Sequence, residues 1–81
     1  MGVSIQVSFY ALDGANLATA LKRFVSVLDA HGLDYEVGAM STVVRGELDG
    51  IFAALRDAYE QASEGTAAVM VMTVSNACPV L

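Results

Sequence analysis

The fold is decided by the stretch Ala67-Ala68-Val69-Met70-Val71-Met72-Thr73-Val74, which is followed by Ser75-Asn76-Ala77-Cys78-Pro79. The first part has no charged residue and lacks the polar alternation of a strand with one face in water. A strand that is apolar on both faces must be covered on both faces. Because an 81-residue domain has little material for this, the sequence predicts self-association.

The overall composition supports the same prediction. The chain is 56% hydrophobic and 16% charged, whereas an average domain is about 25% charged. A small domain has a high ratio of surface to volume and should therefore be more polar than average. We expect the excess apolar surface to lie in a subunit interface. No apolar run approaches the roughly 20 residues of a membrane-spanning helix.

Charge and cysteine content limit the possible partners. The net charge is −5, and the basic residues are Lys22, Arg23, Arg45 and Arg56. This disfavours nucleic acid, anionic membranes and strongly phosphorylated ligands, and it suits a neutral or cationic ligand. The single cysteine excludes an intrachain disulfide and a multi-cysteine metal site. Residues 1–7 contain no basic segment of the signal-peptide type, so a cytoplasmic location is expected.

Hydrophobic periodicity predicts six elements in one domain, residues 1–81. The first strand alternates, with Val3, Ile5, Val7 and Phe9 on one face and Ser4, Gln6, Ser8 and Tyr10 on the other. The expected elements are strands at about 3–10, 33–37, 41–47 and 67–74, and helices from about Asn16 to His31 and from near Asp49 to Gly65.

The order β-α-β-β-α-β predicts an α+β fold, the ferredoxin-like sandwich, with a four-stranded antiparallel sheet and two helices on one face. Asn16 and Asp49 are expected to cap the helices, Gly32 and Gly65 to follow them, and Asp13-Gly14 to end the first strand. The first and third strands should be central and the second and fourth should form the edges. The bare sheet face is then expected to pack on a second subunit.

Few residues have the chemistry of a catalytic centre. Cys78 could act as a nucleophile, but no histidine lies near it in sequence to activate it. His31, the single histidine, is expected in the last turn of a helix, where it complements the helix dipole. No acidic pair has metal-ligand spacing with histidine or cysteine, so neither a metal nor a cofactor is expected.

Polar residues at the strand ends form the candidate site. Tyr10 closes the first strand, Ser41-Thr42 opens the third, and Ser75-Asn76 closes the fourth. If Arg45 avoids the core, alternation places Ser41 and Val43 on the open face and Thr42 and Val44 toward the helices. These polar groups either bind a ligand or merely cap strand ends and bridge subunits.

Several blocks of the sequence resemble the YkoF-like family. They are Ser41-Thr42-Val43-Val44-Arg45-Gly46, Leu48-Asp49, Phe52-Ala53-Ala54, Val69-Met70 and Ser75-Asn76-Ala77-Cys78-Pro79. Val7-Ser8-Phe9-Tyr10 is similar to the family's first strand, Ser-x-Tyr-Pro, with Ala11 here in place of the proline. Related single-domain thiamine-binding proteins share this fold.

The resemblance implies a non-catalytic protein of thiamine salvage or transport that binds thiamine or its hydroxymethylpyrimidine moiety. It also implies domains associated in pairs, here a homodimer or a dimer of dimers. The ligand-binding residues that it implies are Tyr10, Met40, Ser41, Thr42, Asn76 and Cys78. Serine, threonine and asparagine supply the donors and acceptors that a pyrimidine needs, and an aromatic ring can stack on it.

Two alternatives remain at the level of sequence. One is a small dimeric α+β enzyme, such as a cofactor-free oxygenase or isomerase, in which His31 or Cys78 would act as the base. The other is a regulatory or structural interaction module, which the fold alone does not exclude.

Overall fold

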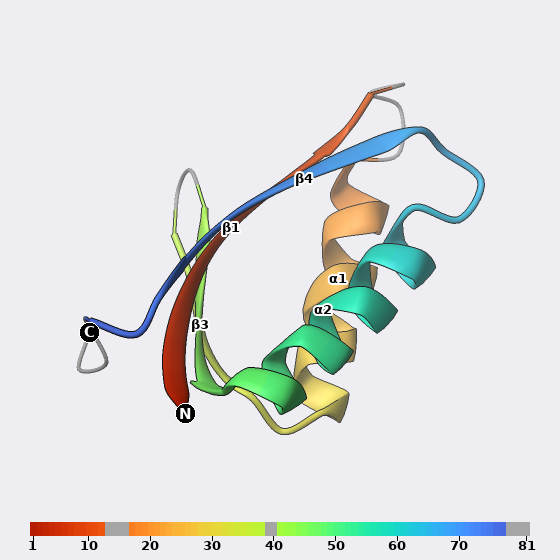
Figure 1. Cartoon of the computed structure of the whole chain (residues 1–81). Helices are drawn as coiled ribbons and strands as arrows, with labels where there is room; N and C mark the ends of the chain where they lie inside the picture. Colours follow the sequence, from red (N-terminus) through yellow and green to blue (C-terminus); the bar gives the residue numbers. More distant parts are fainter. Residues whose placement is uncertain (13–16, 39–40, 78–81) are drawn as a thin grey trace.

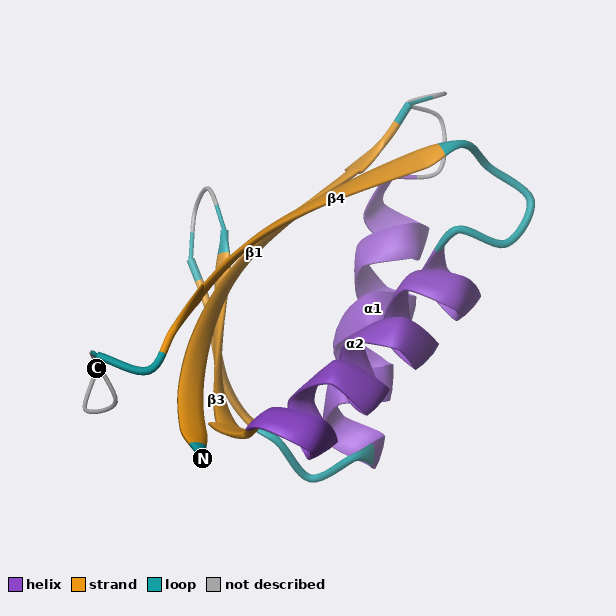
Figure 2. Cartoon of the chain, in the orientation of Figure 1, coloured by secondary structure: helices purple, strands orange, loops and turns teal. Residues whose placement is uncertain are grey.

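A computed structural model describes residues 1–12, 17–38 and 41–77 of the chain. The elements follow the expected order β1 (Gly2–Ala11), α1 (Leu17–Ala30), β2 (Asp34–Val37), β3 (Thr42–Glu47), α2 (Leu48–Ala62) and β4 (Ala68–Ser75) (Figure 1). Both helices lie on the same side of a curved sheet, and none of the described residues forms a helix on the other face (Figure 2).

The sheet is antiparallel throughout and has the order β2-β3-β1-β4. The strands β1 and β3 are therefore central and β2 and β4 are the edges, as the sequence predicts. In the register, Ile5 lies opposite Val44 of β3 and Val74 of β4. The ferredoxin-like α+β fold is confirmed.

The core lies between the helices and one face of β1. The side chains of Val3, Ile5, Val7 and Phe9 are buried there, as the alternation of the first strand predicts. The helices contribute a larger set of buried side chains, comprising Ala20, Phe24, Val27, Leu28, Ile51, Ala54, Leu55, Ala58 and Ala62. Val44 of β3 is fully buried in the same core, so the expected orientation of the third strand is also correct.

The opposite rows of the same strands form the open face of the sheet. The ladder pairs Gln6 with Val43 and Thr73, and it pairs Tyr10 with Val69. In the isolated chain Val69 and Val71 are exposed by 43% and 53%. The open face therefore combines aliphatic side chains with uncharged polar ones over the β1 and β4 half of the sheet.

The helix ends agree with the sequence in part. Gly32 and Gly65 have φ angles of 69° and 79°, the left-handed region that favours glycine after a helix. The start of α2 differs from the expectation. It begins at Leu48, and its N-cap residue Glu47 makes no side-chain hydrogen bond to the helix. Asp49 therefore lies inside the first turn, where its negative charge interacts favourably with the helix dipole. Asn16 and Asp13-Gly14 lie outside the described residues.

Neither described helix combines the length and apolar character needed to cross a bilayer.

The packing predicts unequal effects of truncating two adjacent residues of α2. Ile51 is fully buried, whereas Phe52 is 39% exposed. Ile51→Ala should lower the free energy of unfolding by about 2–5 kcal/mol, because it removes buried methyl groups and leaves a cavity. Urea unfolding at one fixed protein concentration measures this. Phe52→Ala is the control, and a loss as large as that of Ile51→Ala would contradict the assigned core.

Candidate functional site

A cavity of about 310 Å³ lies between α1 and the end of the sheet where β1 finishes and β3 begins. Its floor is β1, one wall is α1, and the other wall is formed by residues 37–38 at the end of β2 and residues 41–42 at the start of β3. The lining residues are Val7, Ser8, Phe9 and Tyr10 from β1, Leu17, Leu21, Phe24 and Val25 from α1, and Val37, Gly38, Ser41 and Thr42 from the β2–β3 side.

The lining is apolar with a few hydroxyl groups. No charged side chain is among the described residues of the lining. The rings of Phe9 and Phe24 stand 5.3 Å apart between centroids and are tilted by 37°. Aromatic and aliphatic walls with a few placed polar groups are typical of small-molecule sites, whose volumes run from roughly 300 to 1,000 Å³. The cavity suits one neutral ring system.

The two hydroxyl residues at the start of β3 differ in direction. Thr42 pairs with Val7 on the helix side of the sheet, so its side chain belongs to the side that contains the cavity. The hydroxyl of Ser41 accepts a hydrogen bond of 3.2 Å from Nε2 of Gln6, whose side chain belongs to the open face. Thr42 is therefore the better placed of the two to bond a ligand inside the cavity.

The end of β2 and the start of β3 approach each other closely beside the cavity. The N–H of Gly38 donates to the carbonyl oxygen of Ser41 at 2.8 Å. A Cβ at position 38 would stand 3.0 Å from that oxygen, so a larger residue would push the backbone at positions 38 and 41 apart.

The other candidate residues lie in different places. Tyr10 contributes to the lining, but it stands in the open-face row and is 52% exposed, which places it at the rim. Asn76 follows Ser75, which pairs with Ser4 near the start of β1. Tyr10, at the rim of the cavity, is six residues further along β1 than Ser4, a distance of roughly 20 Å. Asn76 therefore does not reach the cavity of its own chain. Met40 and Cys78 lie outside the described residues.

Sequence reasoning missed the contribution of α1. Leu17 and Leu21 lie on one face of this helix, and each is 40% exposed and lines the cavity. Their i, i+4 spacing predicts a shared face but does not say whether the sheet fills the space beneath it. A half-covered apolar stripe is visible only after the helix is placed on the sheet.

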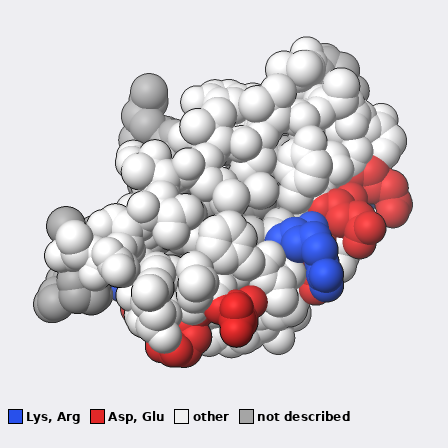
Figure 3. All heavy atoms as spheres, in the orientation of Figure 1, with Lys and Arg blue, Asp and Glu red and all other residues white. Residues whose placement is uncertain are grey.

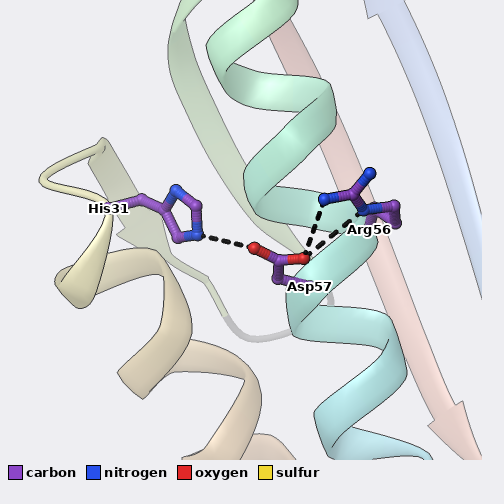
Figure 4. Close-up of polar contacts among 3 residues, drawn as sticks. All are labelled: His31, Arg56 and Asp57. Atoms are coloured by element: carbon purple, nitrogen blue, oxygen red, sulfur yellow. Dashed lines mark hydrogen bonds and ion pairs between the residues drawn. The ribbon is translucent and has the colours of Figure 1, made fainter.

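His31 lies away from the cavity, in a contact between the two helices (Figure 4). Its Nε2 is 3.1 Å from Oδ2 of Asp57 on α2, and the guanidinium of Arg56 donates to the other oxygen of that carboxylate. These groups are about a third exposed or more. The contact ties the C-terminal turn of α1 to α2. No group of three or more metal-ligating side chains occurs among the residues that the structure describes.

A hydrogen bond fixes β2 against α1. The hydroxyl of Tyr35 donates to Oδ1 of Asp29 at 2.8 Å. This bond raises the pKa of Tyr35 above its ordinary value of 10.0, and partial desolvation and the negative charge of Asp29 act in the same direction. Because α1 and the end of β2 are opposite walls of the cavity, this bond holds the two walls in place.

Comparison with known proteins gives the family. A family model described as thiamine-binding protein matches residues 3–76. The chain belongs to this family, which gives it a general role related to thiamine. No curated protein matches it.

Solved structures show the same fold. A hypothetical protein of Methanocaldococcus jannascii is 27% identical, with a TM-score of 0.84, over 93% of this chain and 79% of that one. A candidate thiamine biosynthesis/salvage protein of Thermotoga maritima is 18% identical, with a TM-score of 0.81, over 93% and 83% of the two chains. A domain of unknown function from Bacillus cereus is 22% identical, with a TM-score of 0.83, over 99% and 79%.

The Tyr35–Asp29 bond predicts a pH-dependent difference between the wild type and Tyr35→Phe. A raised pKa means that folding favours the neutral phenol, so the contribution to stability is fully present below about pH 10 and is lost as the pH rises through the folded-state pKa. The wild type should be the more stable protein in urea at neutral pH. This advantage should shrink above about pH 10, where the phenolate can no longer donate. A constant difference across this range would contradict the assigned bond.

Proposed function

We propose that this protein binds thiamine, or the hydroxymethylpyrimidine moiety of thiamine, and does not transform it. The observation that carries the proposal is the uncharged cavity between α1 and the sheet, in a chain of the thiamine-binding family. A pyrimidine presents a flat ring for apolar walls, together with ring nitrogens and an exocyclic amine for hydroxyl partners. Salvage or transport of thiamine in the cytoplasm is the role that fits such a binder.

The proposed pose places the pyrimidine inside and the thiazolium at the mouth. The cavity is at the lower end of the usual range of volumes, which suits one ring better than the whole molecule. A cationic thiazolium in an apolar interior without a counter-charge would be strongly disfavoured. At the mouth it remains in water, beside a protein whose net charge is −5.

The lining also favours binding over turnover. Its described residues include no histidine, cysteine or carboxylate that could serve as a general base. His31, the base of the alternative enzyme hypothesis, is in contact with Asp57 between the helices. Loss of a measured turnover in His31→Ala or Cys78→Ser would favour that alternative.

Calorimetric titration tests the proposal directly. The ligand-free protein, at about 0.1 mM, should release or absorb heat with thiamine and with the pyrimidine alcohol. Complete silence with both would mean a binding free energy weaker than roughly 5–6 kcal/mol and would remove the proposal.

Variants of the cavity test which hydroxyl binds. Thr42→Val should weaken binding about three- to tenfold, the usual net value of one hydrogen bond. Ser41→Ala should weaken it less, because the Ser41 hydroxyl is bonded to Gln6 on the open side. Ser63→Ala, in the turn after α2, is the control and should leave the affinity unchanged. Equal affinities in all three variants would contradict the proposed site.

We further propose that the open face packs on a second copy of the chain. Val43, Val69 and Val71 stand there beside uncharged polar groups. The charged groups of this face lie toward β2, where Arg45 stands 3.7 Å from both Asp34 and Glu36. An exposed aliphatic surface of this kind on so small a domain is typical of a subunit interface.

Light scattering after size exclusion should show at least a dimer at micromolar concentration. Val43→Lys should lower the measured mass, because it places a charge in the centre of the apolar interface. In the isolated subunit the lysine can pair with Glu36, which lies opposite it on β2, so the fold should persist. Phe52→Ser, on the helix side, is the control. A monomeric wild type would contradict the proposed interface.

A further inference from the structure

A second cleft, of about 250 Å³, lies between the N-terminal half of α1 and the C-terminal end of α2. The residues that line it are Thr19, Ala20 and Arg23 from α1, Ala62 from α2, and Glu64, Gly65 and Thr66 from the connection to β4. It shares no described lining residue with the cavity beside β2. The two spaces lie against different sides of α1, so the cleft is separate from the proposed thiamine site.

Small residues on both walls create the space of this cleft. Ala20 and Ala62 carry one methyl group each, and Gly65 leaves open space where a Cβ would stand. Gly65 also has a φ angle of 79°, which a residue with a side chain adopts only with strain. The turn that ends α2 therefore favours a residue that keeps the cleft open.

Two opposite charges line the cleft without neutralising each other. Arg23 lies on α1 and Glu64 lies on the facing wall. Neither takes part in an ion pair with another residue in the described part of the chain, whereas Arg45 and Arg56 both contact carboxylates. The guanidinium of Arg23 has the planar set of donors that matches a carboxylate. The cleft therefore offers one charged group for an anion and another for a cation.

The C-terminal end of α2 provides a further attraction for a positive charge. Its last turn contains no basic side chain, so nothing within the helix compensates the negative end of the helix dipole. The backbone bonds of the turn go to the carbonyl oxygens of Tyr59, Gln61 and Ser63, and none of them goes to Ala62. Acidic side chains also lie around this end of the helix (Figure 3). Such a helix end needs a donor from outside the helix.

We propose that this cleft binds a small zwitterion, an α-amino acid, with its carboxylate at Arg23 and its ammonium group at Glu64 and the end of α2. The hydroxyls of Thr19 and Thr66 supply further donors and acceptors. A simple anion would meet the charge of Glu64 and the negative end of the helix, and a simple cation would meet Arg23. A ligand that carries both charges satisfies both walls.

NMR titration of the ¹⁵N-labelled protein tests the site at constant ionic strength. L-serine should shift the amide signals of Thr19, Arg23, Gly65 and Thr66 in a saturable manner. Acetate and methylammonium carry one charge each, so half-saturation should need at least about tenfold more of either one, the equivalent of roughly 1.4 kcal/mol. The proposal would be overturned by the absence of saturable shifts with L-serine up to about 50 mM, a binding free energy of roughly 2 kcal/mol. It would also be overturned by equal half-saturation with acetate alone.

A pair of adjacent variants identifies the carboxylate partner. Arg23→Gln should weaken the binding of L-serine at least about tenfold, because it removes a charge-assisted hydrogen bond. Lys22→Gln is the matched control, since it removes the same charge from the next position of α1, outside the lining, and should leave the affinity unchanged. Equal affinities of the wild type and a folded Arg23→Gln protein would overturn the proposal. If Arg23→Gln fails to fold, Glu64→Gln in the exposed connection decides by the same loss of affinity. The thiamine titration is independent of these outcomes, because the two sites share no described residue.

Discussion

The structure depends on the two-sided hydrogen bonding of β1. Its odd-numbered residues bond β3, as the bond from Leu48 to the carbonyl of Met1 indicates, and its even-numbered residues bond β4. The same alternation sends Val3, Ile5, Val7 and Phe9 into the core. One strand thus sets the register of both neighbours and supplies the apolar face on which the helices pack. A slip of one residue would reverse both assignments together.

The cavity is a consequence of how α1 covers this strand. Phe24 and Leu28 reach the core, whereas Leu17 and Leu21 are each 40% exposed and line the cavity. The backbone hydrogen bond from Gly38 to Ser41 and the bond between Tyr35 and Asp29 hold the facing wall. The site therefore lies where the helix stops filling the space above the sheet, and its polar groups come from the strand ends beneath.

Most of the fold could be predicted from the sequence, because period and polarity are local properties. The alternation of the first strand, the helix-ending Gly32 and Gly65, and the opposite directions of Thr42 and Arg45 all follow from neighbouring residues. The site was harder to predict, because it depends on contacts between residues that lie far apart in the sequence. Asn76 resembles a site residue in its motif, yet it follows Ser75, which the register pairs with Ser4 near the start of β1. The cavity walls from α1 are set by the position of that helix on the sheet.

The lining of the cavity is largely separate from the residues that hold the fold together. Leu17, Leu21 and Val37 lie outside the buried core cluster, which is built from β1, Val44 and the inner faces of the helices. Substitutions at these positions change the shape and polarity of the wall at little cost in stability. During evolution such a scaffold can acquire a new ligand preference by a few surface-type replacements, while selection on the core keeps the sheet and its register unchanged.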